Sequence, residues 1–145
     1  MYGKILAQYQ RTKVETAGKM DLVIMCYEKT LQALHEAKTF FEANEFEKKA
    51  HKLQLALDII HELQVSLNFE KGGQIAANLD SIYNYISRRL LQGDIEKHTS
   101  AYDECIHILS ELKEAWEKID TAQAEGSRIS PAAQTEKINI SRLAA

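Results

Sequence analysis

Two acid–histidine pairs are the residues in this sequence best suited by type and spacing to bind metal ions. Asp58 precedes His61 by three positions, and Glu104 precedes His107 in the same way. In bundles that carry metal ions, such pairs project inward from facing helices. At about 100° per residue, however, Asp58 and His107 lie roughly 160° from the apolar stripes of their helices. The helix between them offers only Asp80, so we predict no metal site and no cofactor.

Phosphoryl transfer through His51 is a second candidate chemistry. Residues 50–53 read Ala-His-Lys-Leu, which resembles the start of the motif in histidine phosphotransfer modules. Those modules usually continue with Lys and Gly, where this chain has Gln54 and Leu55. We therefore interpret His51 as an exposed histidine on a helix surface, and we predict that the protein is not an enzyme.

The composition is that of one globular domain. The 145 residues are 45% hydrophobic and 27% charged, and the net charge of −3 argues against binding to nucleic acid or to an anionic membrane. No apolar run approaches the ~20 residues that span a bilayer, and the first residues lack the apolar core of a signal peptide. Cys26 and Cys105 show no pattern of a redox pair. We expect a cytosolic protein with two buried free thiols.

Apolar residues recur at helical spacing through most of the chain, and this pattern predicts four helices. The first is capped by Thr16 and ends before residues 43–45; the second runs from about 46 to 69 and ends at Lys71-Gly72-Gly73. The third ends near Gly93, and the fourth runs from residue 99 or 100 to about 120. Long helices with short connections favour an all-α, antiparallel up-down-up-down four-helix bundle over residues 1–120, with a cap segment at 1–15 and a flexible tail at 121–145.

The four predicted stripes do not use all the apolar residues. A second set lies more than ~90° from the stripe centres. Some of its members are boundary residues, but as a set they predict apolar surface, which on a monomer usually marks a partner site. We expect an amphipathic helix from another protein to lie in a groove there. The set comprises Leu22, Met25, Cys26, Phe40, Leu55, Ile59, Val65, Tyr85, Leu91 and Ile108.

One segment carries a resemblance to a known family. Residues 66–79 read Ser-Leu-Asn-Phe-Glu-Lys-Gly-Gly-Gln-Ile-Ala-Ala-Asn-Leu, and Ile82-Tyr83, Tyr85 and Arg88-Arg89-Leu90-Leu91 follow. This pattern resembles the signature of the flagellin export chaperones, the FliS family. Weaker matches at Thr16-Ala17, Leu22, residues 25–27, Leu112 and Ala115-Trp116 extend the likeness over about residues 5–119. Many relatives carry a proline where this chain has Gly18-Lys19, and relatives usually end soon after the Trp116 region.

The resemblance implies a function as well as a fold. It implies a cytoplasmic helical bundle that binds the C-terminal segment of flagellin, prevents premature polymerisation and delivers flagellin to the type III export gate. It also implies that the N-terminal segment covers part of the binding surface, which by match assigns contacts to Ile5 and Tyr9. The predicted partner contacts are Ile5, Tyr9, Leu22, Met25, Leu55, Ile59 and Tyr85.

Residues 121–145 lie beyond the part of the chain that the resemblance covers. Their end is apolar, with Ile138, Ile140 and Leu143, and we hypothesise that it mimics a client in a neighbour's groove. A homodimer formed through the tail or through the groove stays an open alternative.

Overall fold

Four helices make up the part of the chain that the structure describes. The structure is a computed structural model and describes residues 18–125. It contains α2 (Lys19–Glu42), α3 (Phe46–Val65), α4 (Phe69–Glu96) and α5 (Ser100–Glu125). Residues 18–125 contain no strand, and the predicted all-α class is confirmed.

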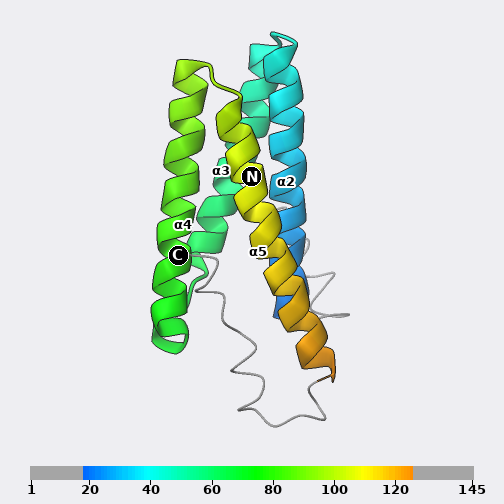
Figure 1. Ribbon diagram of the computed structural model, residues 1–145, viewed down its shortest axis with the longest axis vertical. Coiled ribbons are helices and arrows are strands. Elements are labelled where there is room, and N and C mark those ends of the chain that lie inside the picture. Colours follow the sequence, from blue (N-terminus) through cyan, green and yellow to red (C-terminus); the bar gives the residue numbers. More distant parts are fainter. Residues whose placement is uncertain (1–17, 126–145) are drawn as a thin grey trace.

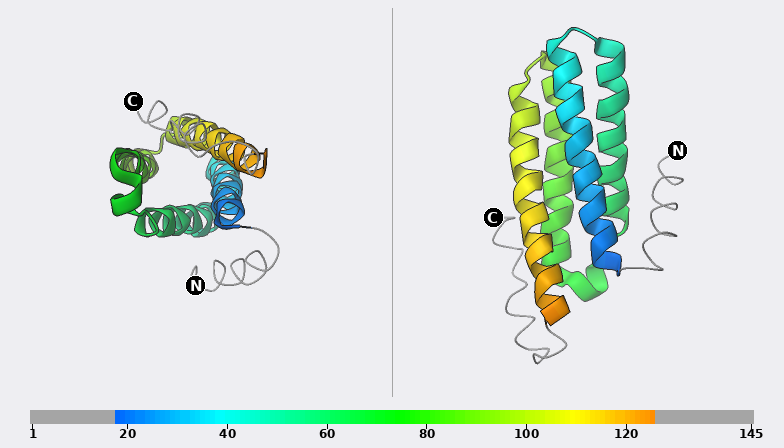
Figure 2. Two further views of the ribbon diagram at one scale, coloured as in Figure 1. Left: turned by 90° about the horizontal axis from the view of Figure 1, so that it is seen from below. Right: turned by 90° about the vertical axis from the view of Figure 1, so that its right-hand side faces the viewer.

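The four helices stand antiparallel in a ring (Figures 1 and 2). Each helix packs on its neighbours in the sequence, and α5 closes the ring against α2. The connections cover only residues 43–45, 66–68 and 97–99. Connections this short make consecutive helices antiparallel, so the predicted up-down-up-down bundle is confirmed.

The turn between α2 and α3 falls at the predicted break. Asn44 adopts a left-handed φ of 59°, a conformation that commonly ends helices. The backbone N–H groups of Asn44 and Glu45 donate to the carbonyl oxygens of Phe41 and Phe40 at 3.1 and 2.9 Å. These bonds satisfy carbonyl groups that the end of a helix leaves free. Thr16, the predicted cap of this helix, lies outside the described residues.

The predicted end of the second helix at Lys71-Gly72-Gly73 is wrong. α3 already ends at Val65, and Asn68 caps α4 because its side-chain oxygen accepts a hydrogen bond from the Lys71 backbone N–H at 2.9 Å. Gly73 lies inside α4 with φ 49°, which glycine adopts without a steric cost. The glycine therefore kinks α4 near its start and does not end α3.

The fourth helix is longer than predicted. α5 continues to Glu125, beyond the predicted end at residue 120. At the other end of α5, Gly93 of α4 allows a close approach, since a Cβ atom there would lie 2.3 Å from the Cβ of Ala101. The predicted lead and the remainder of the predicted tail lie outside the described residues.

The core includes the four predicted stripes but is wider than predicted, because Cys26 and Ile59 of the second apolar set are also buried in it. Each helix contributes side chains that are almost fully enclosed, and half-buried residues such as Leu31 and Ile82 pack against them. Burial of these side chains supplies the main favourable free energy of folding. The largest enclosed side chains are Tyr27, Leu34, Ile59, Ile60, Tyr83, Ile86, Leu90, Tyr102, Leu109 and Leu112.

Two tyrosines connect α2 and α4, which face each other across the ring. The hydroxyl groups of Tyr27 and Tyr83 lie 2.5 Å apart and share one hydrogen bond. Burial raises the pKa of Tyr27 to about 12 and raises that of Tyr83 as well, so both phenols keep their protons at neutral pH. A buried hydroxyl without a partner costs about 1–3 kcal/mol. This pair therefore favours one register of α2 against α4.

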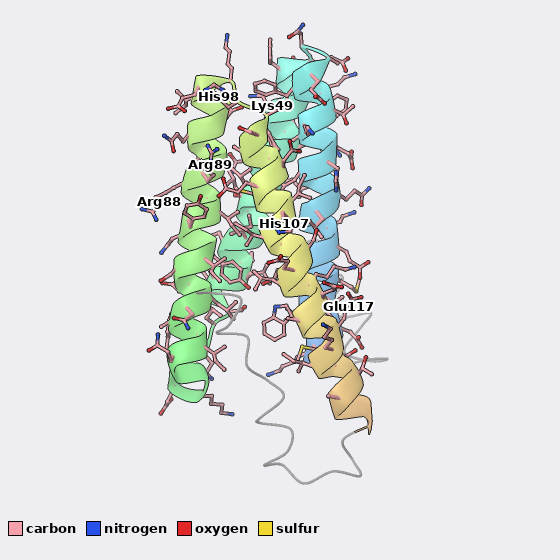
Figure 3. The ribbon with its side chains drawn as sticks, viewed as in Figure 1. Lys49, Arg88, Arg89, His98, His107 and Glu117 are labelled. Carbon is pink, nitrogen blue, oxygen red and sulfur yellow. The ribbon has the colours of Figure 1, made fainter. Side chains whose placement is uncertain are left out.

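A partly buried ion pair lies at the end of the bundle that carries the α2–α3 turn, where Figure 3 labels Lys49. Lys49 of α3 is buried, and its ammonium group pairs with the carboxylate of Asp94 on α4. The same ammonium lies 5.6 Å from the ring centre of Phe41 on α2, within cation–π range. Three helices thus meet around one charged group at this end.

Substitution of the two tyrosines tests their shared hydrogen bond. We expect Tyr27→Phe and Tyr83→Phe each to lower the free energy of unfolding by roughly 1–3 kcal/mol, because each leaves one buried hydroxyl unpaired. The double variant should lose less than the sum of the two single losses. Urea denaturation of the four proteins measures this coupling, and strictly additive losses would contradict it.

Candidate docking groove

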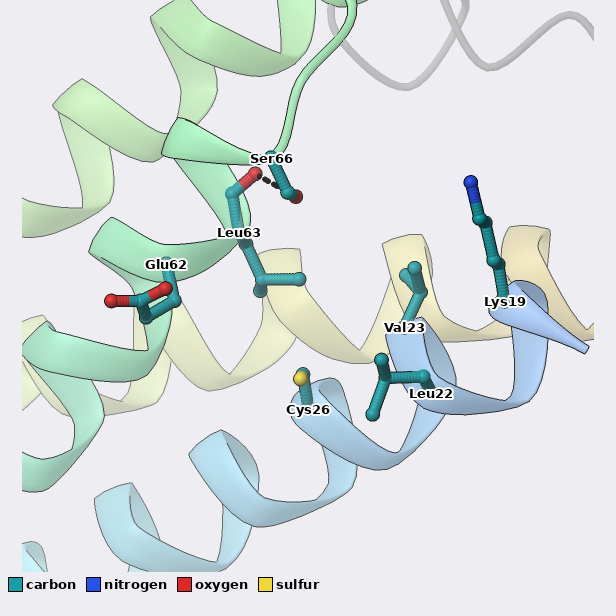
Figure 4. A pocket seen from close by; sticks show the side chains of 7 residues that line it. All are labelled: Lys19, Leu22, Val23, Cys26, Glu62, Leu63 and Ser66. Atoms are coloured by element: carbon teal, nitrogen blue, oxygen red, sulfur yellow. Dashed lines mark hydrogen bonds between the residues drawn. The ribbon is translucent and has the colours of Figure 1, made fainter. Parts of the chain in front are cut away.

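A groove opens between the first turns of α2 and the last turns of α3 (Figure 4). Its volume is about 380 Å³, within the range of sites that hold small ligands or inserted side chains. Cys26 and Leu63 are its most deeply buried residues, while Leu22 and Val23 are half-buried. The groove is lined by Lys19, Leu22, Val23, Cys26, Glu62, Leu63 and Ser66.

The polar groups of the groove leave its centre apolar. The hydroxyl of Ser66 donates to the carbonyl oxygen of Leu63 at 2.8 Å, so this donor is already used by the end of α3. Burial, with a further contribution from the charge of Glu62, raises the pKa of Cys26 to about 11. The Cys26 side chain is therefore a neutral thiol at physiological pH and packs as a small apolar group. Lys19 and Glu62 provide the charges of the lining.

Exposed apolar side chains follow the groove at the α3–α4 junction. Val65 is 66% exposed and Phe69 is 54% exposed. They flank the turn at residues 66–68, at the end of the bundle where α2 begins. Large exposed apolar residues next to an apolar groove are typical of a surface that binds another polypeptide.

The structure places the predicted contact residues at different depths. Leu22 lines the groove. Met25 is half-buried on the same helix, and Leu55 is half-buried on α3. Ile5 and Tyr9 lie outside the described residues. Sequence reasoning did not assign Val23, Leu63 and Ser66 to this surface.

The expectation that Ile59 lies on an exposed face is wrong. Its side chain is 1% exposed and belongs to the core cluster. The buried face of α3 includes Ala56, Ile59, Ile60 and Leu63, the i, i+3, i+4, i+7 spacing of a wide apolar stripe. The predicted stripe was too narrow because α3 is enclosed by its neighbours over this wider face.

Tyr85 lies on a different face, between α4 and α5. Its side chain is 40% exposed, and its hydroxyl donates a hydrogen bond to Glu104 of α5. Arg89 Nε donates to the same carboxylate at 2.7 Å, and Figure 3 shows Arg89 on the side of α4 that faces α5. The hydrogen bond from Tyr85, followed by that from Arg89, lowers the pKa of Glu104. The Tyr85 ring is thus held in place, with part of it open to solvent.

Asp58 and His107, weighed above as metal ligands, each have a partner on their own helix. Within the described part of the chain, no three His, Cys, Asp or Glu side chains form a group that could hold a metal ion. Asp58 Oδ1 accepts a hydrogen bond from Gln54 Nε2 at 2.8 Å. His107 Nε2 lies 2.9 Å from Glu111 Oε1 on the same helix. His51 is exposed on α3, as predicted.

The fold and the groove define a class: an antiparallel helical-bundle protein with an apolar groove at one end. No helix within residues 18–125 has the length and apolar character needed to cross a membrane.

Comparison with known proteins identifies the family. The family described as flagellar protein FliS matches residues 2–123. The flagellar secretion chaperone FliS of Salmonella typhimurium is 36% identical over 107 residues, which cover 73% of this chain and 79% of the relative. The chain belongs to the FliS family, as its sequence resemblance predicted.

Two further relatives support this assignment. The flagellar secretion chaperone FliSB of Pseudomonas aeruginosa is 31% identical over 120 residues, covering 80% of this chain and 95% of the relative. FliS of Escherichia coli is 33% identical over 106 residues, covering 72% and 78%. The family match ends at residue 123, so nearly all of the predicted tail lies beyond it.

Glutamate substitutions on α3 test the assignment of Ile59 to the core. We expect Ile59→Glu to lower the free energy of unfolding by more than about 4 kcal/mol or to prevent folding, because an unpaired charge would be buried. Val65→Glu on the same helix is the matched control and should change stability by less than about 1 kcal/mol. Circular dichroism during urea denaturation measures the free energy of unfolding of both variants. Normal stability of Ile59→Glu would show that Ile59 lies at the surface and not in the core.

Proposed function

We propose that this protein binds the C-terminal segment of newly made flagellin in the cytosol. It thereby prevents premature polymerisation and assists delivery of flagellin to the flagellar type III export gate. The observation that carries this proposal is an apolar groove between α2 and α3 in a chain of the FliS family. The relatives are named flagellar secretion chaperones, which agrees with it.

The groove suits a segment that becomes ordered when it binds. An amphipathic helix can place aliphatic side chains against Leu22, Val23 and Leu63, as in other helix-in-groove complexes. A disordered segment that folds on binding typically buries about 1,000–3,000 Å², at an ordering cost of about 2–5 kcal/mol. The groove is lined by seven residues, whereas an interface of about 800 Å² per partner takes about 20–30 residues a side. The flagellin segment therefore extends over neighbouring surface.

The exposed junction residues provide that neighbouring surface. Val65 and Phe69 lie immediately before and after the α3–α4 turn. Met25 and Leu55 are half-buried on the two groove helices, while Tyr85 offers a partly exposed ring on a separate face, between α4 and α5. We assign flagellin contacts to these residues together with Leu22. Ile59 lies in the core and makes no direct contact with flagellin.

Binding of this kind needs no catalytic group. The groove thiol is neutral because burial raises its pKa, and stabilisation of a helix in an apolar groove neither makes nor breaks a covalent bond. We therefore propose a stoichiometric chaperone and not an enzyme.

Titration calorimetry with full-length flagellin and with flagellin lacking its C-terminal segment tests the proposed client. We expect one flagellin per chaperone chain for the full-length protein and no measurable binding after truncation. Equal affinity for the two forms of flagellin would contradict the proposed segment.

A pair of leucine variants tests the groove in the same assay. Leu22→Glu places a charge in the groove lining, and we expect the affinity for flagellin to fall by at least about tenfold. Leu91→Glu is the matched control, because Leu91 is 47% exposed near the other end of α4. Circular dichroism checks that both variants fold. Loss of binding in Leu91→Glu, with normal binding in Leu22→Glu, would move the site to the other end of the bundle.

A further inference from the structure

The groove and the end of α5 lie at the same end of the bundle. α2 begins there, α3 ends there and α5 ends there, as Figures 1 and 2 show. α2 stands between the other two helices in the ring, because it packs on α3 on one side and on α5 on the other. Residues that follow α5 therefore start about one and a half helix spacings from the groove, or roughly 12–15 Å.

Residues 126–145 include an apolar face of their own. At about 100° per residue, Ile140, Leu143 and Ala144 share one side of a helix and Ile138 falls on the opposite side. Lys137 flanks the apolar side at the same periodicity. The whole segment is basic, with Arg128, Lys137 and Arg142 against the single acid Glu136.

We infer that residues 138–145 dock as a short amphipathic helix in the α2–α3 groove of the same chain. Ile140 and Leu143 pack against Leu22, Val23 and Leu63, the aliphatic residues of the groove lining. Lys137 reaches the carboxylate of Glu62, which forms no ion pair among the described residues. The occupant is the part of the chain that lies beyond the family match.

The connecting residues have the length that this docking requires. Residues 126–137 contain Gly126, Ser127, Ser130 and Pro131. A flexible chain of that length has an r.m.s. end-to-end distance of about 19 Å, from about 5–6 Å times the square root of the residue number. This distance is sufficient to span the one and a half helix spacings between the end of α5 and the groove.

The covalent connection through residues 126–137 is the reason for assigning the occupant to the same chain and not to a second copy. An eight-residue helix buries far less than the roughly 1,200 Å² of a stable protein–protein interface. A weak segment on a short flexible linker has an effective local concentration in the millimolar range. Intramolecular docking therefore occurs at protein concentrations at which a dimer built on this contact would dissociate.

Methyl NMR spectra of the full chain test this inference without any client. In the double variant Ile140→Glu/Leu143→Glu, we expect the methyl resonances of Leu22, Val23 and Leu63 to shift. Methyl groups at the closed end of the bundle, such as Leu90, should not shift. Ile138→Glu is the matched control, because it adds the same charge on the opposite side of the same segment and should leave the groove resonances unchanged.

Each other outcome overturns the proposal. Unchanged groove resonances in the double variant exclude docking of the tail. Equal shifts in Ile138→Glu exclude the assigned face. If the wild-type groove resonances change on dilution while the double variant's do not, the occupant is the tail of a second copy. Because the experiment contains no flagellin, its result is independent of whether the groove binds flagellin.

Discussion

The hydrogen bond between Tyr27 and Tyr83 is the interaction on which the arrangement of the bundle depends most directly. It connects the two helices that face each other across the ring, and both of its oxygen atoms are buried. A slide of α2 against α4 would leave two phenol groups in the core without partners, and each would cost about 1–3 kcal/mol. Apolar packing around the pair tolerates small shifts far better, because it is not directional. The tyrosine pair therefore favours one register of α2 against α4.

The two ends of the bundle are built differently, and the difference has a functional consequence. At one end, Lys49, Asp94 and Phe41 join α3, α4 and α2 around a buried charge. At the other end, α2 and α3 leave an apolar groove, and the turn into α4 exposes Val65 and Phe69. The open end suits the flagellin binding that we propose, while the ion pair holds the packing of the other end. A chaperone that must later release its client benefits from such a division, because binding does not require the core to open.

The candidate site shows where reasoning from the sequence stops. Leu22, an apolar residue outside the core stripe of α2, lines the groove. Ile59 and Val65 satisfied the same criterion on α3, yet Ile59 is 1% exposed and Val65 is 66% exposed. Helical periodicity gives the direction of a side chain but not the distance to the neighbouring helix. That distance decided that α3 buries a wide stripe in its middle and leaves its end open.

The sequence by itself determined the helices, their antiparallel order, most of the core and the family. These features depend on local backbone preferences, on the 3.6-residue period of apolar side chains and on a distinctive segment around Asn68 and Gly73. Only the tertiary structure decided that Gly73 kinks α4 instead of ending α3, that Tyr27 meets Tyr83, and that Cys26 and Leu63 form the deepest part of a groove. The physical reason is that these outcomes depend on contacts between residues far apart in the chain, and a local pattern carries no information about them.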